Sequence, residues 1–146
     1  MSWDVIFLLA GMIPLGIALE RSGGASDIAE LVVIVAQALP PVAVVALFYL
    51  VTVVVTNLIS NNATVVLLIP VAVDIAAQLE ANAFSFVLAV MFAASTSFLT
   101  PVGYQTNLMV YGPGGYEFGD YLRVGAPLQL LLAGVITVGI WLFWGV

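Results

Sequence analysis

Long apolar blocks separated by short polar interruptions form the pattern of this chain. Residues 3–20 and residues 124–146 are apolar runs close to the roughly 20 residues that cross a bilayer, and each predicts a membrane span. Residues 25–39 form a shorter segment that begins with charged side chains. This segment predicts a helix that lies at the membrane interface.

The first polar interruption lies inside an apolar block over residues 42–79. It reads Thr56-Asn57-Leu58-Ile59-Ser60-Asn61-Asn62-Ala63-Thr64. Each flanking arm is long enough to be a full span or one arm of a re-entrant hairpin with its tip at residues 60–62. Within a bilayer an unwound backbone is tolerated only where protein or water covers it, so this uncharged interruption indicates the lining of a cavity.

The second polar interruption divides the apolar block over residues 84–113. It reads Ser95-Thr96-Ser97-Phe98-Leu99-Thr100-Pro101-Val102-Gly103-Tyr104-Gln105-Thr106-Asn107. Apolar character resumes directly after it. The pattern predicts a broken helix, in which two half-helices are joined by an unwound link.

The composition assigns the chain to a broad class. Hydrophobic residues make up 64% of it and charged residues 7%, whereas a soluble domain carries roughly 25% charge. We therefore predict an all-α polytopic membrane protein. The formal net charge is −6, with eight acidic residues against two arginines, so no nucleic acid is expected as a partner.

Cysteine and histidine are both absent from the sequence. Their absence excludes disulfides, thiolate chemistry, imidazole metal sites and a histidine general base. The sequence also lacks a glycine-rich phosphate loop and a paired-carboxylate site. We therefore predict that the chain is not an enzyme.

The residue types in the two interruptions suggest sodium ligands, because hard cations prefer oxygen. Thr56, Ser60 and Asn61 offer hydroxyl and amide oxygens, and Gly103 permits a backbone conformation that presents carbonyl groups. The second hairpin arm starts near Asn62, where the N-terminus of a helix attracts an anion. For each residue alone, hydrogen bonding between membrane helices is an alternative role.

Together the two interruptions resemble motifs of the divalent anion:sodium symporters, the sulfate and di/tricarboxylate transporters of the ion transporter superfamily. Members carry a Ser-Asn-Thr tip in each of two re-entrant hairpins, which are related by an inverted repeat, and a broken helix follows each hairpin. Residues 56–64 resemble the second tip, and residues 100–107 with 110–112 resemble the second broken helix. The resemblance implies that the chain is part of such an inverted-repeat transporter.

The resemblance also implies roles for individual residues. Sodium, the implied coupling ion, would be bound by Thr56, Ser60, Asn61 and Gly103. No organic cofactor is expected. The residues predicted to bind the anion are Asn61, Asn62, Thr64, Gln105, Thr106 and Asn107.

Two positions depart from the family pattern. Asn62 stands where the third tip position is usually Thr, and Gln105-Thr106 stand where dicarboxylate carriers commonly have Pro-Pro. The form Gly-Tyr-Gln-Thr-Asn resembles the branch associated with sulfate. It favours an inorganic divalent anion as the substrate.

Family members are much longer than this chain, so we expect it to be the carboxyl-terminal portion of a transporter whose N-terminal half is missing here. The whole transporter is expected to be a homodimer in the plasma or inner membrane, surrounded by lipid. Its expected function is sodium-coupled symport of a divalent anion, either sulfate or a di/tricarboxylate.

Two alternatives to sodium symport remain open from the sequence. The chain could be a non-transporting or regulatory membrane module that packs against other helices. It could also belong to a proton-coupled carrier of the same fold, in which Asp74 would be the acid that carries the proton.

Overall fold

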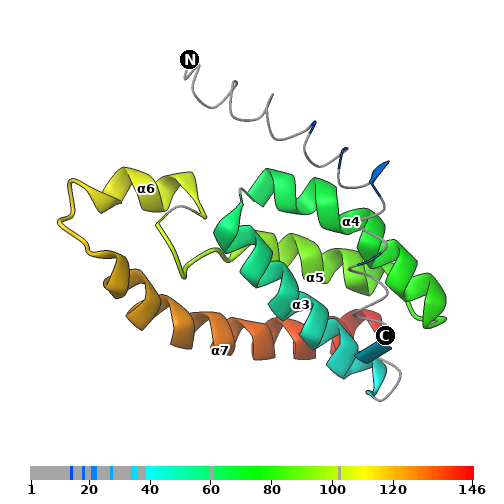
Figure 1. Cartoon of the computed structure of the whole chain (residues 1–146). Helices are drawn as coiled ribbons and strands as arrows, with labels where there is room; N and C mark the ends of the chain where they lie inside the picture. Colours follow the sequence, from blue (N-terminus) through cyan, green and yellow to red (C-terminus); the bar gives the residue numbers. More distant parts are fainter. Residues whose placement is uncertain are drawn as a thin grey trace.

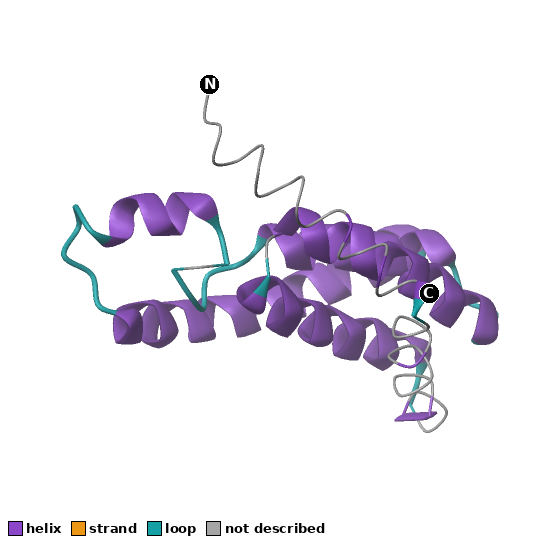
Figure 2. Ribbon diagram, turned by 45° about the horizontal axis from the view of Figure 1, so that its top comes forward, coloured by secondary structure: helices purple, strands orange, loops and turns teal. Residues whose placement is uncertain are grey.

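The computed structural model describes residues 39–146, apart from Ser60 and Val102, together with a few isolated positions earlier in the chain. The predicted span over residues 3–20 and the predicted interfacial helix over residues 25–39 fall largely among the residues that it does not describe. Every described element is an α-helix (Figure 2), which confirms the all-α class. Three of these helices are long and apolar enough to cross a membrane.

Helices α3 (Pro41–Leu58) and α4 (Asn61–Gln78) form a hairpin on either side of the first polar interruption. Helix α3 begins at a proline, which suits the first helical position because its missing N–H has no partner there. It ends where Ile59 is extended, with a φ of −123°. Each helix has 18 residues and is therefore about 27 Å long, close to the thickness of a hydrocarbon core.

Helices α5 (Ala83–Ser95) and α6 (Gln105–Tyr111) lie on either side of the second polar interruption. Asn82 caps the start of α5, since its side chain accepts a hydrogen bond from the N–H of Phe84 at 3.1 Å. The described residues between the two helices are not helical. We refer to residues 96–104 as the link.

The last helix, α7 (Phe118–Trp144), begins before the start predicted at residue 124. A capping box explains the earlier start: the Glu117 N–H donates to the Asp120 carboxylate at 2.9 Å, and the Glu117 side chain accepts from the Asp120 backbone. Charged residues that precede the predicted start therefore belong to the first turns of the helix. Pro127 lies inside α7 without ending it.

Helix α5 is the centre of the fold, because it packs against α3, α4 and α7 (Figure 1). The largest fully buried side chains of this core are aromatic, Phe48, Tyr49 and Phe86, and they pack among valine and alanine side chains. Helix α7 runs antiparallel to α5. Near the end of α7 the chain is tied to the start of α5, where the Asn82 amide donates to the Trp144 carbonyl at 3.0 Å.

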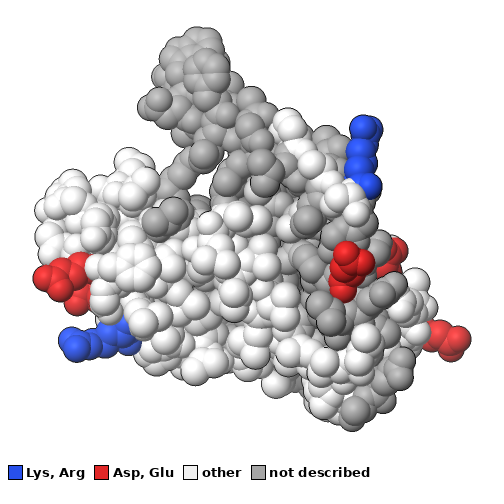
Figure 3. Space-filling view, in the orientation of Figure 1, with Lys and Arg blue, Asp and Glu red and all other residues white. Residues whose placement is uncertain are grey.

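On the face shown in Figure 3, the charged side chains of the described residues lie toward its two ends, and the described surface between them is uncharged. Exposed apolar side chains cover the outward side of α7, including Leu130, Leu131, Val135 and Leu142. An uncharged apolar belt between charged ends is the surface expected of a protein surrounded by lipid. The prediction of an integral membrane protein is thereby supported.

The close contact between α7 and the link leads to a first prediction, for the variant Gly125→Ala. A Cβ atom at Gly125 would collide with the backbone carbonyl of Phe98 and lie 3.2 Å from the Leu99 nitrogen. These backbone atoms can move away from the added Cβ only if the whole link moves. We therefore expect a loss of about 1–3 kcal/mol in unfolding free energy. Thermal unfolding of the detergent-solubilised protein measures this loss.

Gly134→Ala is the matched control, since it lies on the same helix and a Cβ there meets nothing within 4 Å. Alanine is a better helix former than glycine by up to about 1 kcal/mol, so this variant should be unchanged or slightly more stable. Equal unfolding temperatures for the two variants would contradict the close packing.

Candidate functional site

The ends of three helices and the link meet at one place (Figure 1). Helix α3 ends there at Leu58, α4 begins there at Asn61, and α5 ends there at Ser95. The carboxyl ends of α3 and α5 bring partial negative charge, and the amino end of α4 brings partial positive charge. Partial positive and partial negative charge therefore lie side by side. The described side chains that form hydrogen bonds between these helix ends are all uncharged.

Thr56 and Asn61 join the two arms of the hairpin at this place. The Thr56 hydroxyl, which is fully buried, lies 2.9 Å from Asn61 Oδ1 and 3.3 Å from the Ala94 carbonyl oxygen, and it can donate to either. Three uncharged oxygens from α3, α4 and α5 thus lie together. Such a set of oxygens suits a hard monovalent cation.

Asn57 attaches the link to helix α3. Its amide nitrogen donates to the Val53 carbonyl at 2.8 Å, and its Oδ1 accepts from the Ser97 hydroxyl at 3.2 Å. The same oxygen accepts from the backbone N–H groups of Leu99 at 3.0 Å and Thr100 at 3.2 Å. One side chain, only 5% exposed, therefore satisfies three donors of an unwound segment.

Two link hydroxyls bind the last carbonyls of helix α3. The Ser97 hydroxyl lies 3.3 Å from the Thr56 carbonyl and can donate to it instead of to Asn57, and Thr100 donates to the Asn57 carbonyl at 3.0 Å. Carbonyls in the last turn of a helix have no partner inside it, so these bonds replace the missing ones. A hydroxyl can rotate its hydrogen away and offer a lone pair instead, which makes these groups potential cation ligands as well.

Gly103 is buried against the end of α3 at the far side of the link. Its N–H donates to the Thr100 hydroxyl at 3.1 Å. A Cβ atom there would collide with the Ser97 hydroxyl and lie 3.0 Å from both the Thr56 carbonyl oxygen and the Asn57 Cα. Glycine is therefore required here for close approach of two backbones.

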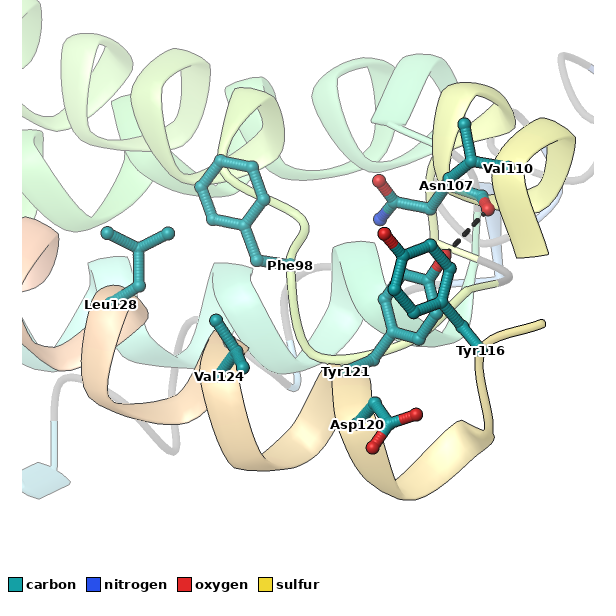
Figure 4. A pocket seen from close by; sticks show the side chains of 9 residues that line it. Phe98, Asn107, Val110, Tyr116, Asp120, Tyr121, Val124 and Leu128 are labelled. Carbon is teal, nitrogen blue, oxygen red and sulfur yellow. Dashed lines mark hydrogen bonds between the residues drawn. The ribbon is translucent and has the colours of Figure 1, made fainter. Parts of the chain in front are cut away.

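Asn107 connects helix α6 to both the link and α7. Its amide nitrogen donates to the carbonyls of Ser97 at 2.8 Å and Thr100 at 3.2 Å. Its own carbonyl accepts from the Tyr121 hydroxyl at 2.9 Å, as the dashed line in Figure 4 shows. Two asparagine side chains, Asn57 from α3 and Asn107 from α6, thus hold the same part of the link, residues 97–100.

The predicted site residues are only partly brought together. Thr56, Asn61, Gly103 and Asn107 take part in this one network of contacts. Thr64 is fully buried within α4. Two others, Asn62 and Thr106, are exposed, while Ser60 and the side chain of Gln105 lie outside what the structure describes.

The structure places Asp74 away from this network. It lies near the far end of α4, more than three helical turns from Asn61, and it is exposed. Among the described residues, no group of three acidic, histidine or cysteine side chains could hold a metal ion. The oxygens available at the helix ends are therefore neutral.

A cavity of about 290 Å³ lies beside the network, between α6 and the first half of α7 (Figure 4). Its walls are mostly apolar and include Phe98, Val110, Val124 and Leu128. Asn107 belongs both to its wall and to the network. The polar network, rather than this cavity, has the chemistry of an ion site.

Sequence reasoning missed three residues of the network: Asn57, Ser97 and Thr100. All three lie inside the interruptions singled out by pattern, but nothing in the pattern separates them from their neighbours. A signal for Asn57 was its place immediately after Thr56, since a buried asparagine near the end of a helix can bond to a neighbouring segment.

Comparison with known proteins adds independent information. A family model described as a citrate transporter (CitMHS) matches residues 1–91, which is more than half of the chain. An uncharacterized transporter of Synechocystis is 50% identical over 144 residues, covering 99% of this chain and 24% of that relative.

Two relatives from Chlamydomonas reinhardtii have more specific names. Probable sodium/sulfate cotransporter 3 is 34% identical over 137 residues, covering 92% of this chain and 15% of that relative. Sodium/sulfate cotransporter 1 is 32% identical over 140 residues, covering 93% of this chain and 16% of that relative. The chain spans less than a quarter of the length of these three relatives. All these names are those of transporters, which confirms that the chain is not an enzyme.

Proposed function

The chain belongs to the citrate transporter family, and on this premise we propose that it forms part of a sodium-coupled symporter of a divalent anion. The names of its sodium/sulfate cotransporter relatives agree with the resemblance to the divalent anion:sodium symporters. The proposal covers a larger transporter, because the relatives are several times longer than this chain.

One observation carries the sodium part of the proposal. Neutral oxygens of Thr56, Asn61 and Ala94 meet at the carboxyl ends of α3 and α5. The negative ends of two helices favour a cation, and neutral ligands suit a monovalent one. In this proposal the Thr56 hydroxyl keeps its hydrogen but rotates it away, and an oxygen lone pair then faces a sodium ion held between these oxygens. Ser60 and Gly103 complete the proposed set of sodium-binding residues.

The anion part of the proposal rests on the start of helix α4. The exposed Asn62 lies in its first turn, at the amino end of a helix, where the helix dipole favours negative charge. Asn61 would then contact both ions, and Thr64, Gln105, Thr106 and Asn107 would complete the anion site. Among anions, sulfate is favoured by the names of two relatives, and citrate by the family description.

Transport requires more than this site. We propose that α3 and α4 form a re-entrant hairpin over residues 42–79, and that residues 84–113 form a broken helix beside it. Both would move as one unit during alternating access. The N-terminal half of the transporter, the homodimer and the plasma or inner membrane belong to the same proposal.

The variant Asn61→Ala tests the sodium site. Removing Oδ1 deletes one of three converging oxygens, so the sodium concentration for half-maximal uptake should rise about tenfold or more. The measurement is uptake of radiolabelled sulfate by the full-length transporter in proteoliposomes over a range of sodium concentrations.

Two further variants on α4 serve as comparisons. Gln78→Ala, an exposed position at the other end of the helix, should follow the wild-type sodium curve. Asn62→Ala should weaken binding of the anion and leave the sodium concentration for half-maximal uptake nearly unchanged. If Asn61→Ala left the sodium curve unchanged, Asn61 would not be a residue of the sodium site.

A further inference from the structure

A second buried polar cluster lies next to the proposed sodium site. Its member Thr96 directly precedes Ser97 in the chain. It consists of Tyr49 on α3, Thr96 directly after α5, and Gln129 on α7. The Tyr49 and Thr96 hydroxyl oxygens are 2.9 Å apart. The Gln129 amide nitrogen donates to Thr96 at 2.9 Å and lies 3.5 Å from the Tyr49 hydroxyl. Three elements that are distant in sequence thus each place a polar side chain at one point.

One acceptor of this cluster is left without a donor. Gln129 is 3% exposed, and its Oε1 has no hydrogen-bond partner among the described residues. A buried acceptor without a partner costs roughly 1–3 kcal/mol. A purely structural glutamine would have to bear this cost in a helix whose other buried positions are mostly small or apolar.

The cluster can rearrange without moving its backbone. Either hydroxyl of the Tyr49–Thr96 pair can be the donor, and Thr96 also donates to the Ala93 carbonyl at 3.1 Å. A half rotation of the Gln129 amide exchanges its oxygen and nitrogen. After this rotation, three side-chain oxygens and the Ala93 carbonyl oxygen lie around one point, and the nitrogen takes the place of the unpaired oxygen.

We propose that Tyr49, Thr96, Gln129 and the Ala93 carbonyl bind a second sodium ion in the transporter. This inference rests on the proposed function, since it assigns a further ion to the same transport cycle. The cation would lie at the carboxyl end of α5, where the helix dipole favours positive charge. It would give the Gln129 oxygen the partner that the described protein groups do not supply.

The chemistry of the cluster favours a monovalent cation over other ligands. All four oxygens are neutral, and no carboxylate takes part in the hydrogen bonds of the cluster. A divalent ion would leave more charge uncompensated in a buried place. An anion would meet hydroxyl and carbonyl oxygens at the negative end of a helix.

The two proposed sodium sites share the end of helix α5. The Ala94 carbonyl accepts from Thr56 in the first site, while the preceding Ala93 carbonyl belongs to the second. Thr96 of the second site is followed by Ser97, which bonds to the Thr56 carbonyl. An ion bound at one site fixes the end of α5, and this end also carries ligands of the other site. The two ions should therefore bind cooperatively.

The test measures sodium activation of sulfate uptake by the full-length transporter in proteoliposomes, with choline replacing sodium. Gln129→Met keeps the side-chain volume and removes the oxygen, so half-maximal sodium should rise about tenfold and the curve should become less steep. Gln129→Glu places a carboxylate at the cation and should restore or lower the half-maximal sodium. Tyr49→Phe removes one ligand oxygen and, like Gln129→Met, should raise the half-maximal sodium concentration.

Thr137→Val is the matched control, because the Thr137 hydroxyl is also buried on α7 without a partner among the described residues, yet lies outside the cluster. It should keep the wild-type sodium curve. Opposite effects of Gln129→Met and Gln129→Glu on the half-maximal sodium concentration support a cation site. If Gln129 were merely structural, a buried charge at this position would not tighten sodium binding. Sodium curves of Gln129→Met and Tyr49→Phe that match wild type overturn the second site while the proposed function stands. Wild-type uptake indifferent to sodium overturns both.

Discussion

Replacing Gly103 with alanine is expected to lower sodium-dependent anion uptake by about a hundredfold or more. The added methyl group would occupy the place of the Ser97 hydroxyl and press against the Thr56 carbonyl oxygen and the Asn57 Cα, each only 3.0 Å away. The link would have to move away from the end of α3. A displacement of about 1 Å at an ion site can cost two orders of magnitude in rate. Initial rates of uptake in proteoliposomes measure the loss.

Two glycines on the same chain provide controls for this experiment. Gly134→Ala and Gly139→Ala place their methyl groups where nothing lies within 4 Å. Both should transport at close to the wild-type rate. A Gly103→Ala protein with normal uptake and a normal sodium requirement would show that the link does not need to lie against α3.

Replacing Asn57 with alanine should produce the largest loss of stability, about 3–5 kcal/mol of unfolding free energy. Two link N–H groups, of Leu99 and Thr100, would lose their common acceptor inside the protein, and the Ser97 hydroxyl would keep only the Thr56 carbonyl at 3.3 Å. Each buried donor left unpaired costs roughly 1–3 kcal/mol, and water entering the gap recovers part of this sum. Thermal unfolding in detergent measures the change, and uptake should be lost in parallel.

Asn62→Ala is the control for Asn57→Ala, since it removes the same side chain from an exposed position on the hairpin. Its unfolding temperature should stay close to wild type. A second variant, Asn57→Asp, keeps the acceptor oxygens but loses the donor to the Val53 carbonyl. It should unfold at an intermediate temperature. If Asn57→Ala and Asn62→Ala unfolded together, Asn57 would not be what holds the link.

The positions where helices end could be predicted from the sequence because uncharged polar residues inside apolar blocks are a strong local signal. Helix α3 ends at Leu58, just before the predicted tip over residues 60–62, and α4 starts within that tip, at Asn61. Helix α5 ends at Ser95, where the second interruption begins. Whether the hairpin re-enters the membrane from one side stays a prediction, since helix length alone suits both arrangements.

The inner structure of the site could not be predicted, because it depends on contacts between residues about 40 positions apart. Asn57 bonds to Ser97, Leu99 and Thr100 only because the link folds back onto α3. Local pattern gives the kind of residue in each interruption but not which oxygen faces which donor. The same holds for Gln129, which looks in sequence like an isolated polar residue in an apolar span.

The start of α7 was predicted too late for a different reason. Glu117 and Asp120 lie before the predicted start, yet this charged pair forms the capping box of the helix. A glutamate at the N-cap position is a weaker signal than serine or threonine. The contact of Tyr121 with α6 comes from the turns that this earlier start adds to the helix.

The most direct test of the central claim is the sodium dependence of anion uptake by the full-length transporter in proteoliposomes. Radiolabelled sulfate and radiolabelled citrate are each offered with an inward gradient of sodium, and again with choline in its place at constant pH. We predict uptake of at least one of these anions in sodium, and a loss of most of it in choline. Equal uptake in sodium and choline, for every anion that is taken up, would contradict a sodium-coupled symporter.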